Sequence, residues 1–417
     1  MSEPVVECPD LACTRRRLLT AAGAVAGLSV MELAAPRMAF AADRGRADLL
    51  VVITLEGGAD GLSLVPPLAD HGYAAARPDV HVTPGQALHL DRAFGLHPGL
   101  KPLLPYWHDK KLAIVHAAGD SDGTRSHFEA TNAMERGVNI GNPVGSGWID
   151  RFMMARGLHT GDFPALDIGR GSGALAGGVP AFTTWDVRSI RLQVAASRQR
   201  PTERALAQMY AGVTGPIAEA GRATLSAVQR CASFGVQPYH PRPGVTYAPD
   251  GLGNNLAQVA QVAKAGVGLE VACVTMGGWD THEGMGGAAP GTYMSQQVAR
   301  LGSALAAFAA DLGPQLANTT IVTMSEFGRR VAQNGSNGVD HGHGNAMLVL
   351  GGGIRGGKVY GRWPGLAPQH LDNGDLRVTT DYRDVLGELV HRRLGGRSLG
   401  TVFPDHRPRE LGLAKQR

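Results

Sequence analysis

Residues 48–61 read DLLVVITLEGGADG, an apolar run that passes into a glycine-rich loop with two carboxylates. An unbroken apolar run is typical of a strand buried on both faces, as in a parallel sheet covered by helices. The loop places Glu56 and Asp60 just beyond that strand. Because ligands of open parallel sheets bind outside the carboxyl ends of the strands, this stretch predicts an α/β fold and the edge that carries its site.

The same pattern recurs along the chain. Further strands are predicted at 112–117, 269–275, 319–324 and 347–350. Helical periodicity is present over 127–136, 204–231, 253–265, 293–312 and 381–394. This alternation favours a three-layer α/β fold with a mostly parallel central sheet and helices on both faces. No linker divides residues 45–410, so we expect one domain there, with insertions in the Gly- and Pro-rich segment 140–250.

The first 41 residues have the features of an export signal. Three arginines at 15–17 precede Leu18 and Leu19, an apolar run extends to about Val30, and Ala39-Phe40-Ala41 fits a cleavage site. We interpret residues 1–41 as a signal peptide that resembles a twin-arginine (Tat) signal, the alternative being an ordinary Sec signal. The expected location is periplasmic or extracellular, with the Tat translocase as a partner during export. The apolar run is too short for a stable membrane span.

Composition narrows the class of function. Hydrophobic residues make up 43% of the 417 residues and the net charge is +4, as in an ordinary globular protein. Basic residues do not cluster beside aromatic platforms, which argues against nucleic-acid binding. Beyond the signal, the cysteines are Cys231 and Cys273, which could form a disulfide or lie as small buried hydrophobes. The 15 histidines direct attention to metal binding.

Two loops with histidines are the main candidates for a metal site. Asp280 and His282 follow a predicted strand, and side chains two residues apart in an extended segment point the same way. Both could ligate one cation, or Asp280 could instead cap a helix. Asp340, His341 and His343 lie within four residues, and the glycines between them would let both imidazoles face one metal. The alternative for this loop is a polar surface turn.

Carboxylates and arginines at other strand ends complete the candidate set. Glu326 could ligate a metal or pair with Arg329 or Arg330. These arginines could instead hold an anionic substrate group, because a guanidinium binds phosphate or sulfate with two donors. Glu56 or Asp60 could reach a metal, although Asp and Gly also favour turns.

Residues 124–129 open a helix. Ser126 fits an N-cap there. It could also be a nucleophile that a metal or His127 activates. The helix N-terminus would favour an anion at this position. Arg125 would then hold the anionic group. The chain has no GxGxxG fingerprint, Walker A loop, GxSxG elbow or HExxH helix in a fitting place.

These motifs together resemble one family. The matching segments are Leu55–Gly61, Arg125–Phe128, Gly277–His282, Ser325–Arg330, Asp340–Gly344 and Thr380–Arg383. In this order they look like the DUF1501 family of bacterial, commonly Tat-exported proteins. That family is similar at fold level to the alkaline phosphatase and sulfatase superfamily. The resemblance implies an alkaline-phosphatase-like fold, a nucleophile at a helix start, and one or two metals held by Asp and His.

The resemblance also implies roles for single residues. Glu56 or Asp60 would replace the metal-binding Asp of the first strand, and Ser126 would be the nucleophile. Asp280 with His282 looks like the superfamily's Asp–His pair, although the spacing is shorter.

The later motifs depart from the superfamily pattern. Glu326 stands where an Asp is usual, Phe327 replaces a ligand histidine, and His341 or His343 would be the last ligand. The Phe327 departure leaves open a one-metal site, a rearranged site or lost catalysis.

The sequence thus predicts a metal-dependent hydrolase of phosphate or sulfate esters. Ser126 would attack a small anionic ester held by Arg125 or Arg329, with His127 assisting. Zinc suits the mixed His and carboxylate set best, and calcium, manganese or magnesium fit its oxygen ligands. The alternative is a non-catalytic exported binding or maturation protein on a degenerate hydrolase fold.

Overall fold

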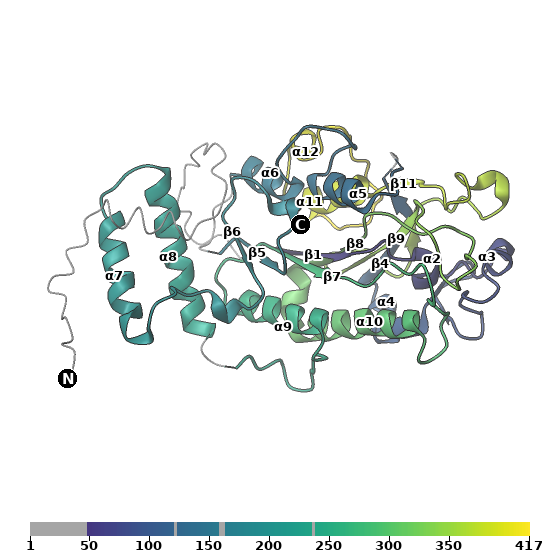
Figure 1. Ribbon diagram of the computed structural model, residues 1–417, viewed down its shortest axis with the longest axis horizontal. Coiled ribbons are helices and arrows are strands. Elements are labelled where there is room, and N and C mark those ends of the chain that lie inside the picture. Colours follow the sequence, from purple (N-terminus) through teal and green to yellow (C-terminus); the bar gives the residue numbers. More distant parts are fainter. Residues whose placement is uncertain (1–47, 121–122, 158–162, 236–237) are drawn as a thin grey trace, which may run out of the picture. The chain divides into compact units, whose positions relative to one another are not determined.

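The structure is a computed structural model that describes residues 48–120, 123–157, 163–235 and 238–417 (Figure 1). The predicted signal peptide, residues 1–41, lies outside the described residues. Within them, no helix combines the length and the apolar character that a bilayer crossing requires.

A nine-stranded sheet forms the centre of the described chain, with strand order β10-β4-β9-β8-β1-β7-β5-β6 and β11 paired to β4. The strands are β1 (Leu49–Leu55), β4 (Leu112–Gly119), β5 (Ala165–Ile168), β6 (Ala181–Thr184), β7 (Val271–Met276), β8 (Thr319–Met324), β9 (Asn345–Gly351), β10 (Val359–Tyr360) and β11 (Thr380–Asp381). All pairs are parallel except those of β9, which runs antiparallel to both β4 and β8. A separate antiparallel pair joins β2 (Leu88–His89) to β3 (Gly95–Leu96).

The central strand β1 has apolar side chains on both faces. It pairs in parallel with β7 on one side and β8 on the other. Leu49, Val51 and Ile53 lie in one hydrophobic core, whereas Leu50 and Val52 lie in a second core. This alternation is the consequence of the two-residue repeat of a strand. It explains why the sequence shows an unbroken apolar run.

Helices cover both faces of the sheet. The α-helices are α2 (Gly61–Leu64), α3 (His71–Ala76), α4 (Leu104–His108), α5 (His127–Arg136), α6 (Trp148–Ala155), α7 (Gln199–Tyr210), α8 (Pro216–Gly235), α9 (Gly251–Lys264), α10 (Tyr293–Leu312), α11 (Tyr382–Arg392) and α12 (Leu399–Val402). Buried residues of α9 and α10 belong to the first core, and those of α6 and α11 belong to the second. Figure 1 shows α9 and α10 on one side of the sheet and α5, α6, α11 and α12 on the other. The predicted three-layer α/β fold with a mostly parallel sheet is confirmed.

Local sequence signals set the starts of the helices that matter for the site. Ser126 is the N-cap of α5, and its hydroxyl accepts a hydrogen bond from the Glu129 amide at 3.5 Å. Gly137 ends α5 in the left-handed conformation, with φ 62°. Asp381 caps α11 by accepting from the Arg383 amide.

Two sequence expectations need correction. The helix predicted over 204–231 is two helices, α7 and α8. They are separated because Gly212 and Gly215 adopt left-handed backbone conformations, with φ 68° and 113°. The strands β5 and β6 were not predicted, because each has four residues and no long apolar run.

The two described cysteines are not joined. Cys231 and Cys273 are both free and buried, so of the two sequence alternatives the small buried hydrophobe applies.

Candidate functional site

The site lies at the edge where β1, β7 and β8 end. These strands are parallel, so the loops that leave them begin side by side. Strand β9 runs the opposite way, and therefore the loop before it, not after it, reaches the same edge. This direction explains why His341 precedes a strand whereas Asp280 and Glu326 follow one. Helix α5 contributes its first residue, His127.

Three imidazoles converge on one carboxylate. The Nε2 atoms of His282 and His341 each lie 3.2 Å from Asp280 Oδ1, and His127 Nε2 lies 3.6 Å from Asp280 Oδ2. The two Nε2 atoms of His282 and His341 are themselves 2.9 Å apart. Donor atoms of His127, Asp280 and His341 all lie within 4.8 Å of one another, close enough for one metal ion.

The outer ring nitrogens are each held by an oxygen. His127 Nδ1 contacts Glu326 Oε1 at 2.8 Å, His282 Nδ1 contacts Asp340 Oδ1 at 2.9 Å, and His341 Nδ1 contacts the Arg125 carbonyl oxygen at 2.9 Å. Carboxylate and carbonyl oxygens only accept, so each Nδ1 donates. In a neutral ring, the lone pair is then on Nε2, which faces the centre of the cluster.

The donor set fits a metal ion. Neutral rings would direct three lone pairs at a carboxylate, an arrangement that only protons or a cation can stabilise. His127 Nε2 is buried and has no hydrogen-bond partner among the described residues. Burial lowers the pKa of His341, which favours its neutral, metal-binding form. Ligand imidazoles held by carboxylate or carbonyl oxygens are the usual arrangement in metalloproteins.

Arg329 fixes Asp280 from behind. Its side chain is fully buried, and it donates to Asp280 Oδ1 at 2.7 Å and to the carbonyls of Gly58, Trp279 and Val339 at 2.6, 2.9 and 3.0 Å. Burial alone would raise the pKa of Asp280, but the hydrogen bond and positive charge of Arg329, together with the contact to His341, outweigh it and lower that pKa. Asp280 is therefore a carboxylate at neutral pH. The expected role of Arg329 as a substrate-binding residue does not fit, because its donors are already used within the protein.

Phe327 is a wall of the cluster. Its ring centroid lies 4.8 Å from those of both His127 and His341. The backbone at Gly58 passes close to the phenyl ring, since a Cβ on Gly58 would lie 2.5 Å from it. Phe327, at the position where the sequence resemblance implied a ligand histidine, therefore packs against two candidate ligands and supplies no donor atom itself.

Glu326 contacts the outer side of the cluster, at the ring nitrogen of His127 that points away from Asp280. Its side chain is buried, and Oε1 accepts from the Gly57 amide and from His127 Nδ1, each at 2.8 Å. Asp340 has the equivalent place beside His282, with a further hydrogen bond from Asn334 at 3.0 Å. Both residues orient ring nitrogens in this structure, whereas the sequence predicts them as direct ligands.

Asp60 and His343 are directed elsewhere. The Asp60 carboxylate is buried and binds both terminal nitrogens of Arg77 and the Ser63 hydroxyl. The ring of His343 contacts Asp372 and the Gly123 carbonyl at 3.3 and 3.1 Å. The expectation that His341 and His343 face one metal is thus not met, because the segment is not a simple extended strand. Instead, His341 forms an isolated antiparallel bridge, and the next residue, Gly342, packs against the backbone of the opposite segment.

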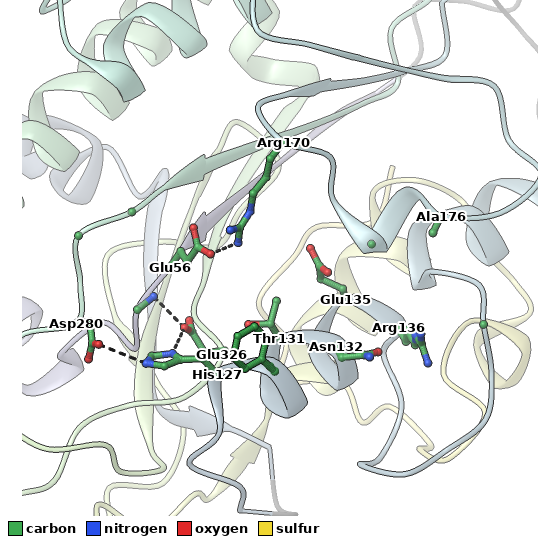
Figure 2. A pocket seen from close by; sticks show the side chains of 16 residues that line it. Glu56, His127, Thr131, Asn132, Glu135, Arg136, Arg170, Ala176, Asp280 and Glu326 are labelled. Carbon is green, nitrogen blue, oxygen red and sulfur yellow. Dashed lines mark hydrogen bonds and ion pairs between the residues drawn. The ribbon is translucent and has the colours of Figure 1, made fainter. Parts of the chain in front are cut away.

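A cavity of about 620 Å³ opens beside the cluster. Its lining includes Glu56, His127, Asp280, Glu326 and Arg170. Figure 2 shows Arg170 reaching towards Glu56, with which it forms an ion pair, while His127 lies between Glu326 and Asp280. Glu56 therefore lines the cavity without joining the group that could hold a metal.

The arginines that line the cavity are not those that the sequence predicted to bind a substrate. Arg136 and Arg170 line it, whereas Arg125 and Ser126 are not among its lining residues. The Arg125 guanidinium binds Asp375, and its carbonyl orients His341.

Some of these roles are not visible in the sequence. Arg136 and Arg170 have no distinguishing motif. The sequence did single out His127, but as a residue assisting Ser126 and not as a ligand. Its position directly after a helix cap was the available signal.

Residues 247–403 match the family model DUF1501, which is described as a protein of unknown function. The expected DUF1501 resemblance is confirmed over this segment. The DUF1501 segment contains Asp280, His282 and His341, whereas His127 and Arg170 precede it. Among curated proteins, none matches the chain.

Several solved structures are similar to the chain. One is the PsFucS1 sulfatase from Pseudoalteromonas sp., with TM-score 0.34 and 14% identity, covering 75% of this chain and 64% of that one. Another is a variant of the alkaline phosphatase PafA, with TM-score 0.33 and 10% identity over 69% of this chain and 64% of the other. The lipoteichoic acid synthase LtaP from Listeria monocytogenes has TM-score 0.31 and 8% identity, over 73% and 65%. The chain thus spans just under two thirds of these proteins. Because the TM-scores are below 0.5, no residue is assigned from them.

Proposed function

We propose that this chain is an exported, metal-dependent hydrolase of phosphate or sulfate esters. The observation that carries the proposal is the convergence of three imidazole Nε2 atoms on the Asp280 carboxylate at the edge of an open cavity. Neither a structural core nor a surface salt bridge needs that arrangement of lone pairs.

The proposed ligands are His127, Asp280 and His341, with His282 as a fourth. Nitrogen donors with one carboxylate oxygen are the set that zinc prefers, so zinc is the favoured ion over calcium, manganese or magnesium. A bound divalent ion polarises an ester oxygen and stabilises the negative charge that develops on it. The chain itself keeps the ligand rings in the required orientation through Glu326 and the Arg125 carbonyl.

The anionic end of a substrate would be bound from the other side of the cavity. Arg170 has 61% of its side chain exposed and faces the cavity, and Arg136 lies on its α5 wall. A guanidinium binds a phosphate or sulfate oxygen pair with two parallel donors. The ion pair with Glu56 would place Arg170 for this contact. These two arginines replace Arg125 and Arg329 in the proposal, because neither Arg125 nor Arg329 is a lining residue of the cavity.

Export remains part of the proposal. The arginine pair, apolar run and cleavage site of residues 1–41 support passage through the Tat translocase to the periplasm or beyond. Tat substrates cross already folded, which would suit a protein that acquires its metal before export.

A second candidate is a non-catalytic exported binding or maturation protein. Two observations favour it. Phe327 lies where a further ligand histidine is expected, and Ser126, the expected nucleophile, caps α5 and is not a lining residue of the cavity. A cluster that binds a metal without turning over any ester would support this alternative.

Metal content is the measurement that tests the proposal. The mature protein, purified without chelator or affinity histidines, should contain metal close to one ion per chain by mass spectrometry. A His127→Ala/His341→Ala double variant should lose it. His343→Ala is the matched control. It removes an imidazole from the same loop, but that imidazole contacts Asp372 and not the cluster. If the wild type takes up no zinc, manganese or calcium, or if His343→Ala loses metal as the double variant does, the proposed centre is wrong.

A further inference from the structure

One face of helix α5 lines the cavity with three different functional groups. His127, Thr131 and Glu135 are spaced four residues apart, and all three are lining residues. Side chains at this spacing lie on the same helix face, with Cβ atoms about 5–6 Å apart. An imidazole, a hydroxyl and a carboxyl therefore follow one another along the cavity wall, starting at the proposed metal centre. Figure 2 shows all three along this helix.

The Thr131 hydroxyl is free to act on a ligand. It is partly exposed, and it has no hydrogen-bond partner within the part of the chain that the structure describes. Threonine in a helix commonly donates to the carbonyl four residues earlier, as Thr319 does to Gln315 at 2.9 Å after a short 3₁₀ turn. Ser126 differs from Thr131 in two ways. Its hydroxyl is already used as the cap of α5, and it is not a lining residue of the cavity.

Glu135 is half-buried and is held by a neighbouring hydroxyl. Its Oε1 accepts from the Ser172 hydroxyl at 3.1 Å, and a Cβ on Gly173 would lie 2.5 Å from Oε2. Burial raises the pKa of Glu135, against weaker lowering contributions from Ser172 and the Gly173 amide. A carboxylate with a raised pKa takes up a proton more readily than an exposed one.

We propose that Thr131 is the catalytic hydroxyl of this site and that Glu135, one turn further along the same helix face, accepts its proton through a water molecule in the open cavity. This inference rests on the proposed hydrolase function and changes the residue that performs the attack. A bond forms between Thr131 Oγ1 and the phosphorus or sulfur of the ester, and the bond to the ester oxygen breaks. The alcohol leaves with the bonding electron pair and takes a proton from water in the open cavity.

The second half restores the enzyme. Water attacks the phosphorus or sulfur, the bond to Thr131 Oγ1 breaks, and Glu135 returns the proton to that oxygen. The attacking water releases one proton. This proton neutralises the hydroxide that formed when the leaving alcohol took a proton from water in the first half. The sum is one ester and one water converted into one alcohol and one phosphate or sulfate, so no further reactant is required.

The closing experiment traps the covalent intermediate on the full mature chain loaded with zinc. The probes are p-nitrophenyl phosphate and p-nitrophenyl sulfate, with acid quenching and peptide mass spectrometry. The wild type and Thr131→Ser should carry a phosphoryl or sulfuryl group on residue 131. Thr131→Val, which keeps the side-chain shape, should carry none and lose about a thousandfold or more in kcat. Glu135→Gln should slow formation of the adduct by about a hundredfold or more.

Two controls separate the possible failures. Metal content should be unchanged in Thr131→Val and Glu135→Gln, so that a lost rate cannot reflect a lost ion. Ser126→Ala should still form the adduct on Thr131. An adduct on Ser126, or full turnover by Thr131→Val, would overturn the inference and leave the proposed function intact. A metal-loaded wild type that neither hydrolyses these probes nor forms an adduct would overturn both.

Discussion

The substitution Asp60→Asn distinguishes a buried ion pair from a metal ligand. The sequence places Asp60 beside a strand end, where it is a reasonable ligand. In the structure its carboxylate is 1% exposed and faces the fully buried guanidinium of Arg77. We expect the variant to lose stability while its metal content stays unchanged.

The size of the loss follows from what Arg77 would retain. Its other donor contacts are to the carbonyls of Val331 and Arg330, each at 2.8 Å, and these carry no net charge. Asparagine would leave the buried Arg77 cation without an opposite charge. Its amide NH2 group would also face a guanidinium N–H of Arg77, where an acceptor is needed. Removing one partner of a buried ion pair costs about 3–5 kcal/mol, and we expect a decrease of that size in the free energy of unfolding.

The pH dependence has a definite sign. Burial alone would raise the pKa of Asp60, but its interactions with Arg77 outweigh burial and hold that pKa below its usual value. The carboxylate therefore stabilises the protein above the unfolded-state pKa of about 4, and this contribution is lost as the pH falls through the folded-state pKa. The difference between wild type and Asp60→Asn should be constant from neutral pH to about pH 5 and should shrink in stronger acid.

Urea denaturation with parallel metal analysis is the assay. Asp109→Asn is the control, because it removes the carboxylate of an exposed ion pair with Lys111, and such pairs contribute little. A variant Asp60→Asn that keeps its unfolding midpoint but loses metal would refute the reasoning and restore Asp60 as a ligand.

Three further predictions follow from single contacts. Arg329→Met removes the donors that hold Asp280, so metal affinity in chelator competition should fall about 10–100-fold, and an unchanged affinity would exclude a positioning role. Phe327→Ala removes the buried ring against two candidate ligands and should lower the free energy of unfolding in urea by about 3–5 kcal/mol, whereas a loss below about 1 kcal/mol would show that the ring packs loosely. Burial lowers the pKa of His116 to about 4, so wild type should lose up to about 3 kcal/mol between pH 6.5 and pH 4, where the unfolded chain binds the extra proton. His116→Gln should show a flatter dependence of the unfolding midpoint on pH, and parallel curves for the two proteins would contradict this assignment.

The sequence predicted the fold where apolar periodicity was long. Strand β1 is buried on both faces and leaves an uninterrupted apolar run, and α10 leaves a twenty-residue helical pattern. Strand β5 reads Ala-Leu-Asp-Ile, which is too short and too polar at Asp167 to stand out. Its position in the sheet depends on pairing with β7, which is a tertiary property.

The sequence named the loops that meet at the candidate site, but it did not distinguish how their individual atoms are placed. Asp280, His282 and His341 were named from the sequence, because polar residues after or before buried strands are visible there. Which hydroxyl of α5 lines the cavity depends on how the helix is rotated about its axis against the sheet. Ser126 and Thr131 cannot be distinguished in this way from the sequence alone.

The proposed ligands come from residues 127, 280 and 341, which are separated by well over a hundred and by about sixty positions. Contacts between segments so far apart in the sequence form slowly, because each one closes a long loop and so costs chain entropy. No ribosome-bound chain shorter than 341 residues can contain the full donor set. Ion binding would therefore report completion of the fold, and its free energy would add to that of folding. If the proposed centre holds an ion, an ion-free chain should be easier for proteases to open, and metal supply would then affect the lifetime of the protein as well as its chemistry.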